Sequence, residues 1–134
     1  MYNNNNKFDV DLQYGQEGER LLTWFGTDQS KVEVKTERDT WAETGNAVFE
    51  YESRGKPSGV AVTEADYWCH IFKEKDQAVM LFIFRTLELK EFLRLVYKHP
   101  EDYGARICKG GDNNTSSVIL LPISQLHRIG NIYV

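Results

Sequence analysis

KVEVKT at residues 31–36 and AVFEYES at residues 47–53 are two neighbouring stretches of similar design. In the first, Glu33 and Lys35 alternate with valines, and in the second two glutamates stand two positions apart among residues that favour β-strands. Side chains two positions apart on a strand point to the same face of a sheet. The sequence therefore predicts two strands that each present charge on one face. These faces are either solvated surface or the walls of a site for a divalent metal ion.

Helical and strand patterns alternate along the rest of the chain. Residues 15–25 and the run TLELKEFLRLVYKHP at 86–100 carry apolar side chains at helical spacing. YWCHIF and AVMLFIFR, separated by the polar turn KEKDQ, predict a hairpin of buried strands. SVILLP predicts a last strand, with Pro122 at a strand end or a sheet edge. The pattern predicts an α/β or α+β fold, in which a mixed central β-sheet is flanked by helices.

Length and composition indicate one globular domain. A chain of 134 residues can bury a core of its own, so we expect residues 1–134 to form a single domain. The start MYNNNNK, residues 1–7, is typical of a disordered tail. The absence of a signal-like segment and of a bilayer-spanning run predicts a cytoplasmic protein with no membrane partner. Cys69 and Cys108 stand beside apolar residues and are expected to be reduced, mostly buried thiols.

The charge is distributed unevenly between the two halves of the chain. The net charge of −4 argues against indiscriminate binding to nucleic acid. Residues 1–66 hold seven Lys and Arg against thirteen Asp and Glu, whereas residues 67–134 hold nine against seven. An acidic region in an otherwise balanced protein is typical of a cation site, and equally of a solvated surface.

Several segments together resemble one enzyme superfamily. These are VEVKT, the helix start with Gly15, Glu19 and Arg20, and the stretches TGNAVFEYESRGKPSG and TEADYW. They resemble the PD-(D/E)XK nucleases with the restriction-endonuclease-like fold, in particular small phage-type endonucleases and resolvase-like members. The resemblance covers roughly residues 9–70, and E-x-K alone is a weak motif. It implies Mg²⁺- or Mn²⁺-dependent hydrolysis of DNA phosphodiesters, by a protein located in the cytoplasm, that of the host cell if it is phage-encoded.

The superfamily pattern fits this chain in two frames. In the conventional frame Glu33 and Lys35 match E-x-K and Asp28 is the upstream metal ligand, although Asp28 stands closer to the motif than is usual. In the shifted frame Glu33 is the upstream acid, and Glu50 with Glu52 forms an E-x-E variant beside Lys35. We favour the shifted frame, because strands near residues 33 and 50 could pair as neighbours and place both acids on one face. Glu33 and Glu50 are then the expected metal ligands.

Further residues are expected to assist. The resemblance assigns a catalytic role to Glu19 of the first helix, although Glu17 lies nearer its apolar face. Arg54 and Lys56 in SRGKPSG, and Lys109 before the loop GGDNNTSS, are candidates for gripping DNA phosphates.

Other polar and aromatic residues are given structural roles. His70 is interpreted as a packed histidine on a buried strand, and no His/Cys spacing supports zinc. Trp41, in a polar stretch, is either part of the core or a platform for a base.

These observations predict a metal-dependent DNA endonuclease, selective for junctions or branched DNA if it is resolvase-like. A homodimer would supply the two sites that cutting both strands requires. The alternative is a nuclease-like module without activity that binds nucleic acid or another partner.

Overall fold

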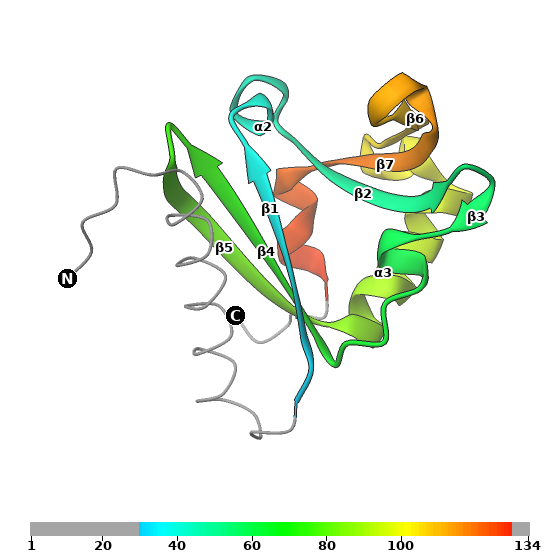
Figure 1. Cartoon of the computed structure of the whole chain (residues 1–134), viewed down its shortest axis with the longest axis horizontal. Coiled ribbons are helices and arrows are strands. Elements are labelled where there is room, and N and C mark those ends of the chain that lie inside the picture. Colours follow the sequence, from blue (N-terminus) through cyan, green and yellow to red (C-terminus); the bar gives the residue numbers. More distant parts are fainter. Residues whose placement is uncertain (1–29, 130–134) are drawn as a thin grey trace.

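The computed structural model describes residues 30–129, which adopt an α+β fold (Figure 1). The class agrees with the sequence-based expectation. The helix expected at 15–25 and the tail at 1–7 lie outside the described residues. The helices and strands are β1 (Val32–Arg38), α2 (Thr40–Thr44), β2 (Asn46–Ser53), β3 (Lys56–Pro57), β4 (Tyr67–Glu74), β5 (Gln77–Arg85), α3 (Thr86–Lys98), β6 (Arg106–Gly110) and β7 (Ser116–Pro122). The 3-10 turns are η1 (Gly59–Ala61), η2 (Pro100–Tyr103), η3 (Asp112–Asn114) and η4 (Ile123–Arg128).

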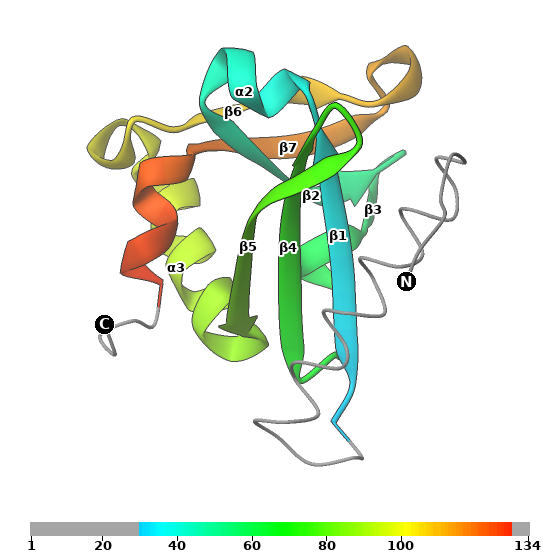
Figure 2. The same cartoon turned by 90° about the vertical axis from the view of Figure 1, so that its left-hand side faces the viewer.

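The strands divide between two sheets, whereas the sequence predicted one. The mixed sheet has the order β1-β4-β5, and the antiparallel sheet has the order β3-β2-β7-β6. In Figure 2 the mixed sheet stands upright, while β7 and β6 cross the top of the view. The expectation that the strands of Glu33 and Glu50 pair as neighbours is wrong, because β1 pairs with β4 and β2 pairs with β3 and β7.

The mixed sheet combines a local hairpin with a distant partner. The predicted β4–β5 hairpin is confirmed, and its two-residue turn, Lys75 and Asp76, has positive φ at both positions. β1 runs parallel to β4, with Val32 opposite Tyr67. Between these two strands the chain passes through β2 of the antiparallel sheet, so the sheets are interleaved along the sequence.

The helix α3 covers the core shared by the sheets (Figure 1). Its buried side chains Leu89, Leu93 and Val96 follow the helical spacing that predicted it, and Pro100 lies just beyond its end. The core also contains Phe49 and Leu121 from the antiparallel sheet and aromatic residues of β4. None of the helices in the described range has the length and apolar character needed to cross a bilayer.

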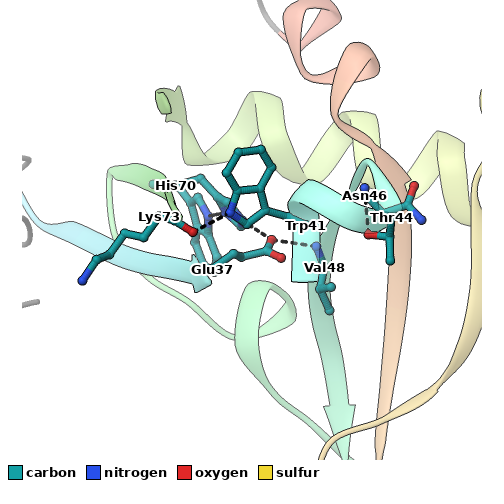
Figure 3. Close-up of polar contacts among 8 residues, drawn as sticks. Glu37, Trp41, Thr44, Asn46, Val48, His70 and Lys73 are labelled. Atoms are coloured by element: carbon teal, nitrogen blue, oxygen red, sulfur yellow. Dashed lines mark hydrogen bonds and ion pairs between the residues drawn. The ribbon is translucent and has the colours of Figure 1, made fainter. Parts of the chain in front are cut away.

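The side chain of Glu37 joins the two sheets (Figure 3). Its Oε2 accepts a hydrogen bond from the backbone N of Val48 at 2.7 Å and lies 2.6 Å from Nε2 of His70. Nε1 of Trp68 donates to Nδ1 of His70 at 3.0 Å, and an indole N–H is only a donor. Nε2 of His70 therefore carries the proton and donates to Glu37. The interpretation of His70 as a packed histidine is confirmed, since the residue is fully buried.

Trp41 has a structural role at the same junction. Its Nε1 donates to the backbone O of Lys73 at 2.7 Å (Figure 3), and its ring meets Phe72 edge-on with the centroids 5.4 Å apart. Trp41 belongs to the short helix α2, which ends at Gly45 in the left-handed conformation. The partner for the indole N–H and the contact with Phe72 place Trp41 beside the core.

Candidate functional site

Glu33 and Lys35 lie on one face of β1, as their spacing predicted. Glu33 is opposite Trp68 and Lys35 is opposite His70 in the β1–β4 register, so all four side chains belong to the same face of the mixed sheet. Among the strands of residues 30–129, β1 lies at the edge of the mixed sheet, and both charged side chains are exposed. Oε1 of Glu33 accepts a hydrogen bond from Oγ1 of Thr63 at 3.2 Å. The face is thus apolar at its centre and charged at its β1 edge.

Glu50 on β2 is held as a carboxylate by three neighbours. Oγ of Ser58 donates to its Oε2 at 2.8 Å. This hydrogen bond and a second from Ser116 hold the pKa of Glu50 below its ordinary value, against an opposing effect of burial that is smaller than either, and the positive charge of Lys35 adds a still smaller lowering. Lys35 of the mixed sheet therefore lies near Glu50 of the antiparallel sheet. The two sheets bring together charges that the sequence separates by one helix and a turn.

A short turn connects the carboxylates of Glu50 and Glu33. It runs from Ser58, whose hydroxyl binds Glu50, through η1 to Thr63, whose hydroxyl binds Glu33. The backbone N of Ser58 donates to the O of Tyr51 at 3.0 Å, and the N of Thr63 donates to the O of Gly59 at 3.2 Å. The turn therefore rests on β2 at one end and reaches β1 at the other. It binds one acid at each end, Glu50 through Ser58 and Glu33 through Thr63.

Gly59 allows the turn to lie directly on β2. Its φ is +53°, and a Cβ at this position would stand 2.3 Å from the backbone O of Glu50. A side chain could not fit there without moving the backbone of the turn away from β2. The glycine in PSG is thus a structural requirement of the carboxylate arrangement.

Glu52 is separated from Glu50 by a β-bulge. Glu50 pairs with Val118, but Glu52 pairs with Ser117, so the register shifts by one residue between them. Ser116 binds Glu50. Ser117 is the next residue of β7, so its side chain points to the opposite face of the sheet. Oγ of Ser117 donates to Oε1 of Glu52 at 3.2 Å. The E-x-E spacing of the shifted frame therefore does not bring both acids to one face.

The three basic residues expected to bind DNA are in two settings. Arg54 and Lys56 are exposed at the β2–β3 hairpin, whose two-residue turn, Arg54 and Gly55, has positive φ at both positions. The backbone N of Arg54 donates to the O of Thr115 at 2.9 Å, which fixes the hairpin against the chain before β7. Lys109 instead donates from Nζ to Oγ of Ser117 at 2.8 Å. The hairpin thus offers two exposed cations, while Lys109 belongs to the network around Glu52.

The upstream acid of the conventional frame and the acids of the expected first helix lie outside the described residues. Asp28, Glu19 and Glu17 precede the described range of 30–129. Within that range, three acidic or histidine side chains with ligand atoms within 4.8 Å of one another are found at His99, Glu101 and Asp102. All three are exposed on or beside η2, and exposed acidic groups of this kind commonly hold no ion.

Three residues of the site were not identified as site residues from the sequence: Ser58, Thr63 and Ser116. Thr63 begins the stretch TEAD, and its Oγ1 accepts a hydrogen bond from the N of Ala65 at 3.3 Å. Ser58 precedes Gly59 in the loop SRGKPSG, and Ser and Gly are residues typical of turns. Ser116 has no sequence signal, because its role depends on pairing with a strand far away in the chain.

Comparisons with protein-family models, with curated proteins and with solved structures gave no match to this chain. A function must therefore be inferred from the chemistry of its own residues. The arrangement offers two carboxylates, one of them with a lowered pKa, a lysine beside them and an exposed basic hairpin. Such a set can hold a hard cation and face a negatively charged substrate.

Proposed function

We propose that this protein is a metal-dependent DNA endonuclease that hydrolyses phosphodiester bonds, with Glu33, Glu50 and Lys35 at its centre. The observation that carries the proposal is the turn from Ser58 to Thr63, whose hydroxyls bind Glu50 and Glu33, with Lys35 on the same strand face as Glu33. The resemblance of VEVKT and its flanking segments to PD-(D/E)XK nucleases supports the same assignment. Glu52 is left out, because the bulge turns it to the other face.

The donor set fits Mg²⁺ or Mn²⁺. These ions prefer oxygen ligands, and Mg²⁺ is commonly bound by one or two carboxylates, with water and substrate phosphate in the other positions. Oε1 of Glu33 and Oε2 of Glu50 accept hydroxyl hydrogen bonds, which orient both carboxylates. A bound ion would supply an activated water and neutralise charge on the phosphate.

Lys35 and the hairpin act on the substrate. The ammonium group of Lys35 orients the attacking water or stabilises the negative charge that develops on the phosphoryl oxygens. Arg54 and Lys56 bind phosphates that flank the cut. A homodimer in the host cytoplasm would place two such sites on a duplex or a branched junction.

Cleavage assays with defined metal ions test the proposal. Purified protein is incubated with plasmid, single-stranded and four-way-junction DNA in Mg²⁺, in Mn²⁺ and in EDTA. We expect cleavage with at least one of the two ions and none in EDTA. Cutting that persists in EDTA contradicts the metal mechanism. Binding without cutting under either ion supports the alternative, a module without nuclease activity.

Single substitutions assign the residues. Glu33→Gln and Glu50→Gln should each reduce cleavage by at least about a hundredfold, since each removes a ligand while nearly keeping the shape of the side chain. Glu43→Gln, on the exposed surface of α2, is the matched control and should cleave normally. Asp28→Asn separates the two frames: loss of activity there, with activity retained in Glu50→Gln, would favour the conventional frame.

A further inference from the structure

An apolar groove lies between α3 and the antiparallel sheet. Its volume is about 420 Å³. Val60, Leu93 and Ile119 contribute apolar walls, and Tyr51 and Tyr97 contribute two aromatic rings. The rings meet edge-on with their centroids 5.5 Å apart. Tyr97 is 53% exposed, so much of this aromatic side chain is open to a ligand.

One edge of the groove is basic. Lys90, Arg94 and Lys98 line it at positions four residues apart on α3, so they form a stripe along one side of the helix. Arg94 and Lys98 are exposed, and within residues 30–129 neither forms an ion pair with a carboxylate. Burial, and after it the neighbouring Tyr97, raises the pKa of Tyr51, which keeps that phenol uncharged beside the cations.

The groove begins at the candidate site. Nζ of Lys90 donates to the backbone O of Thr63 at 2.9 Å, and the hydroxyl of the same threonine binds Glu33. Tyr51 follows Glu50 in β2, so its side chain points to the opposite face of that strand, where it lines the groove. Lys90 therefore joins the groove to the turn whose Thr63 binds Glu33.

We infer that this groove binds an unpaired segment of single-stranded DNA, with a base against Tyr97 and the backbone phosphates along Lys90, Arg94 and Lys98. This inference rests on the proposed nuclease function and adds that the substrate has an unpaired segment next to the cut. Aromatic side chains beside a line of cations match a single strand, which alternates flat base faces with phosphates. A duplex offers the phosphates but keeps its base faces within the stack. An acidic peptide offers the charge without the flat faces.

Binding measurements in EDTA test the groove separately from cleavage. The probe is a fluorescein-labelled oligothymidylate, followed by anisotropy over a series of salt concentrations. Tyr97→Ala should weaken binding about tenfold, since it removes one stacking partner, whereas Tyr97→Phe should bind as the wild type does. Arg94→Gln combined with Lys98→Gln should reduce the slope of log K against log salt by about 1.4, two contacts at about 0.7 each for a single strand.

Leu95→Ala is the matched control. Leu95 is 51% exposed, close to the exposure of Tyr97, but it does not line the groove. We expect unchanged affinity in Leu95→Ala, and circular dichroism should show that every variant keeps its helix content. Unchanged affinity in Tyr97→Ala overturns the inference, and so does an equal loss in Leu95→Ala. A change of oligomeric state in Tyr97→Ala with DNA affinity retained also overturns it, and identifies the groove as a protein contact.

The outcomes separate the groove from the proposed activity. If the wild type binds oligothymidylate through Tyr97 but cuts no DNA in Mg²⁺ or Mn²⁺, the groove inference stands and the nuclease proposal fails. If the wild type cuts DNA and Tyr97→Ala binds the probe as tightly as the wild type does, the reverse holds.

Discussion

Oγ of Ser58 donates a 2.8 Å hydrogen bond to Oε2 of Glu50, eight residues earlier in the chain. It is the largest of the influences that lower the pKa of Glu50, ahead of the hydrogen bond from Ser116 and the charge of Lys35. A group with a lowered pKa stabilises the fold in its ionised form. The same carboxylate therefore links the candidate chemistry to the response of the protein to acid.

Glu50→Gln should change how stability depends on pH. In the wild type, the contribution of ionised Glu50 is fully present above its unfolded pKa of about 4.5 and is lost as the pH falls through the lower folded pKa. The free energy difference between wild type and Glu50→Gln should thus shrink as the pH is lowered from 6 to 3. Urea unfolding at a series of pH values measures it. A difference that is constant over this range would contradict the assignment.

Glu37→Ala should loosen the junction of the two sheets. The substitution leaves the backbone N–H of Val48 and the Nε2–H of buried His70 without their acceptor. Losses of this kind cost about 2–3 kcal/mol in total. Urea unfolding measures the change, and Glu43→Ala on the exposed face of α2 should stay within about 0.5 kcal/mol of the wild type. Equal effects of the two substitutions would show that Glu37 is not a structural link.

Gly59 and Gly55 form a matched pair for alanine substitution. Both have positive φ, +53° and +78°, but a Cβ at Gly59 meets the backbone of Glu50 while a Cβ at Gly55 meets nothing within 4 Å. Gly55→Ala should cost about 1–2 kcal/mol from backbone strain alone. Gly59→Ala should cost at least about 1 kcal/mol more, because the clash adds to the strain. Thermal unfolding of both variants gives the comparison, and the reverse order would mean that the turn does not rest on β2.

The basic hairpin should contribute to DNA affinity through charge. If Arg54 and Lys56 bind phosphates, replacing both with Ala should reduce the slope of log K against log salt by about 1.8 for duplex DNA, at about 0.9 per contact. Filter binding in EDTA measures the slope. Arg106→Ala, an exposed position on β6, is the control and should leave the slope unchanged. An unchanged slope in the double variant would show that Arg54 and Lys56 do not bind DNA phosphates.

The two cysteines should differ in reactivity. Burial raises the pKa of Cys69 to about 11, and the residue is fully buried, whereas Cys108 is only partly buried. At about pH 8 we expect Ellman's reagent to modify Cys108 first in the native protein, because the thiolate is the reactive form. Mass spectrometry of peptides after short labelling identifies the site, with a urea-unfolded sample as the control that labels both. Early modification of Cys69 would contradict the buried position of β4.

Local patterns predicted the elements whose partners are close in sequence. The β4–β5 hairpin and α3 follow from alternating and helical spacing, because the hairpin pairs across a two-residue turn and the hydrogen bonds of a helix are local. β6 was missed, since the five residues RICKG contain only two apolar side chains and lie beside glycines. The first strand was expected to end near residue 36, so Glu37 was not seen to continue the alternation of Glu33 and Lys35 along β1.

Relationships between distant segments could not be read from the chain. Nothing in KVEVKT specifies that β1 pairs with β4 and not with β2, because both candidates are apolar strands of suitable length. The bulge between Glu50 and Glu52 likewise depends on the register with β7. Glu33 and Glu50 were expected to meet by strand pairing, whereas a turn and Lys35 link their surroundings.

The interleaving of the two sheets has a kinetic consequence. β1 reaches β4 only after the chain has passed through β2, and β2 in turn pairs with β7 near the other end of the described residues. Within residues 30–129 the local structure comprises α3 and the β2–β3, β4–β5 and β6–β7 hairpins. The β1–β4 and β2–β7 pairs join distant segments, so long loops must close before either sheet is complete. We therefore expect slow refolding, on the scale of milliseconds to seconds, with both sheets forming in one cooperative step. A fragment ending at the β4–β5 turn should remain unfolded on its own.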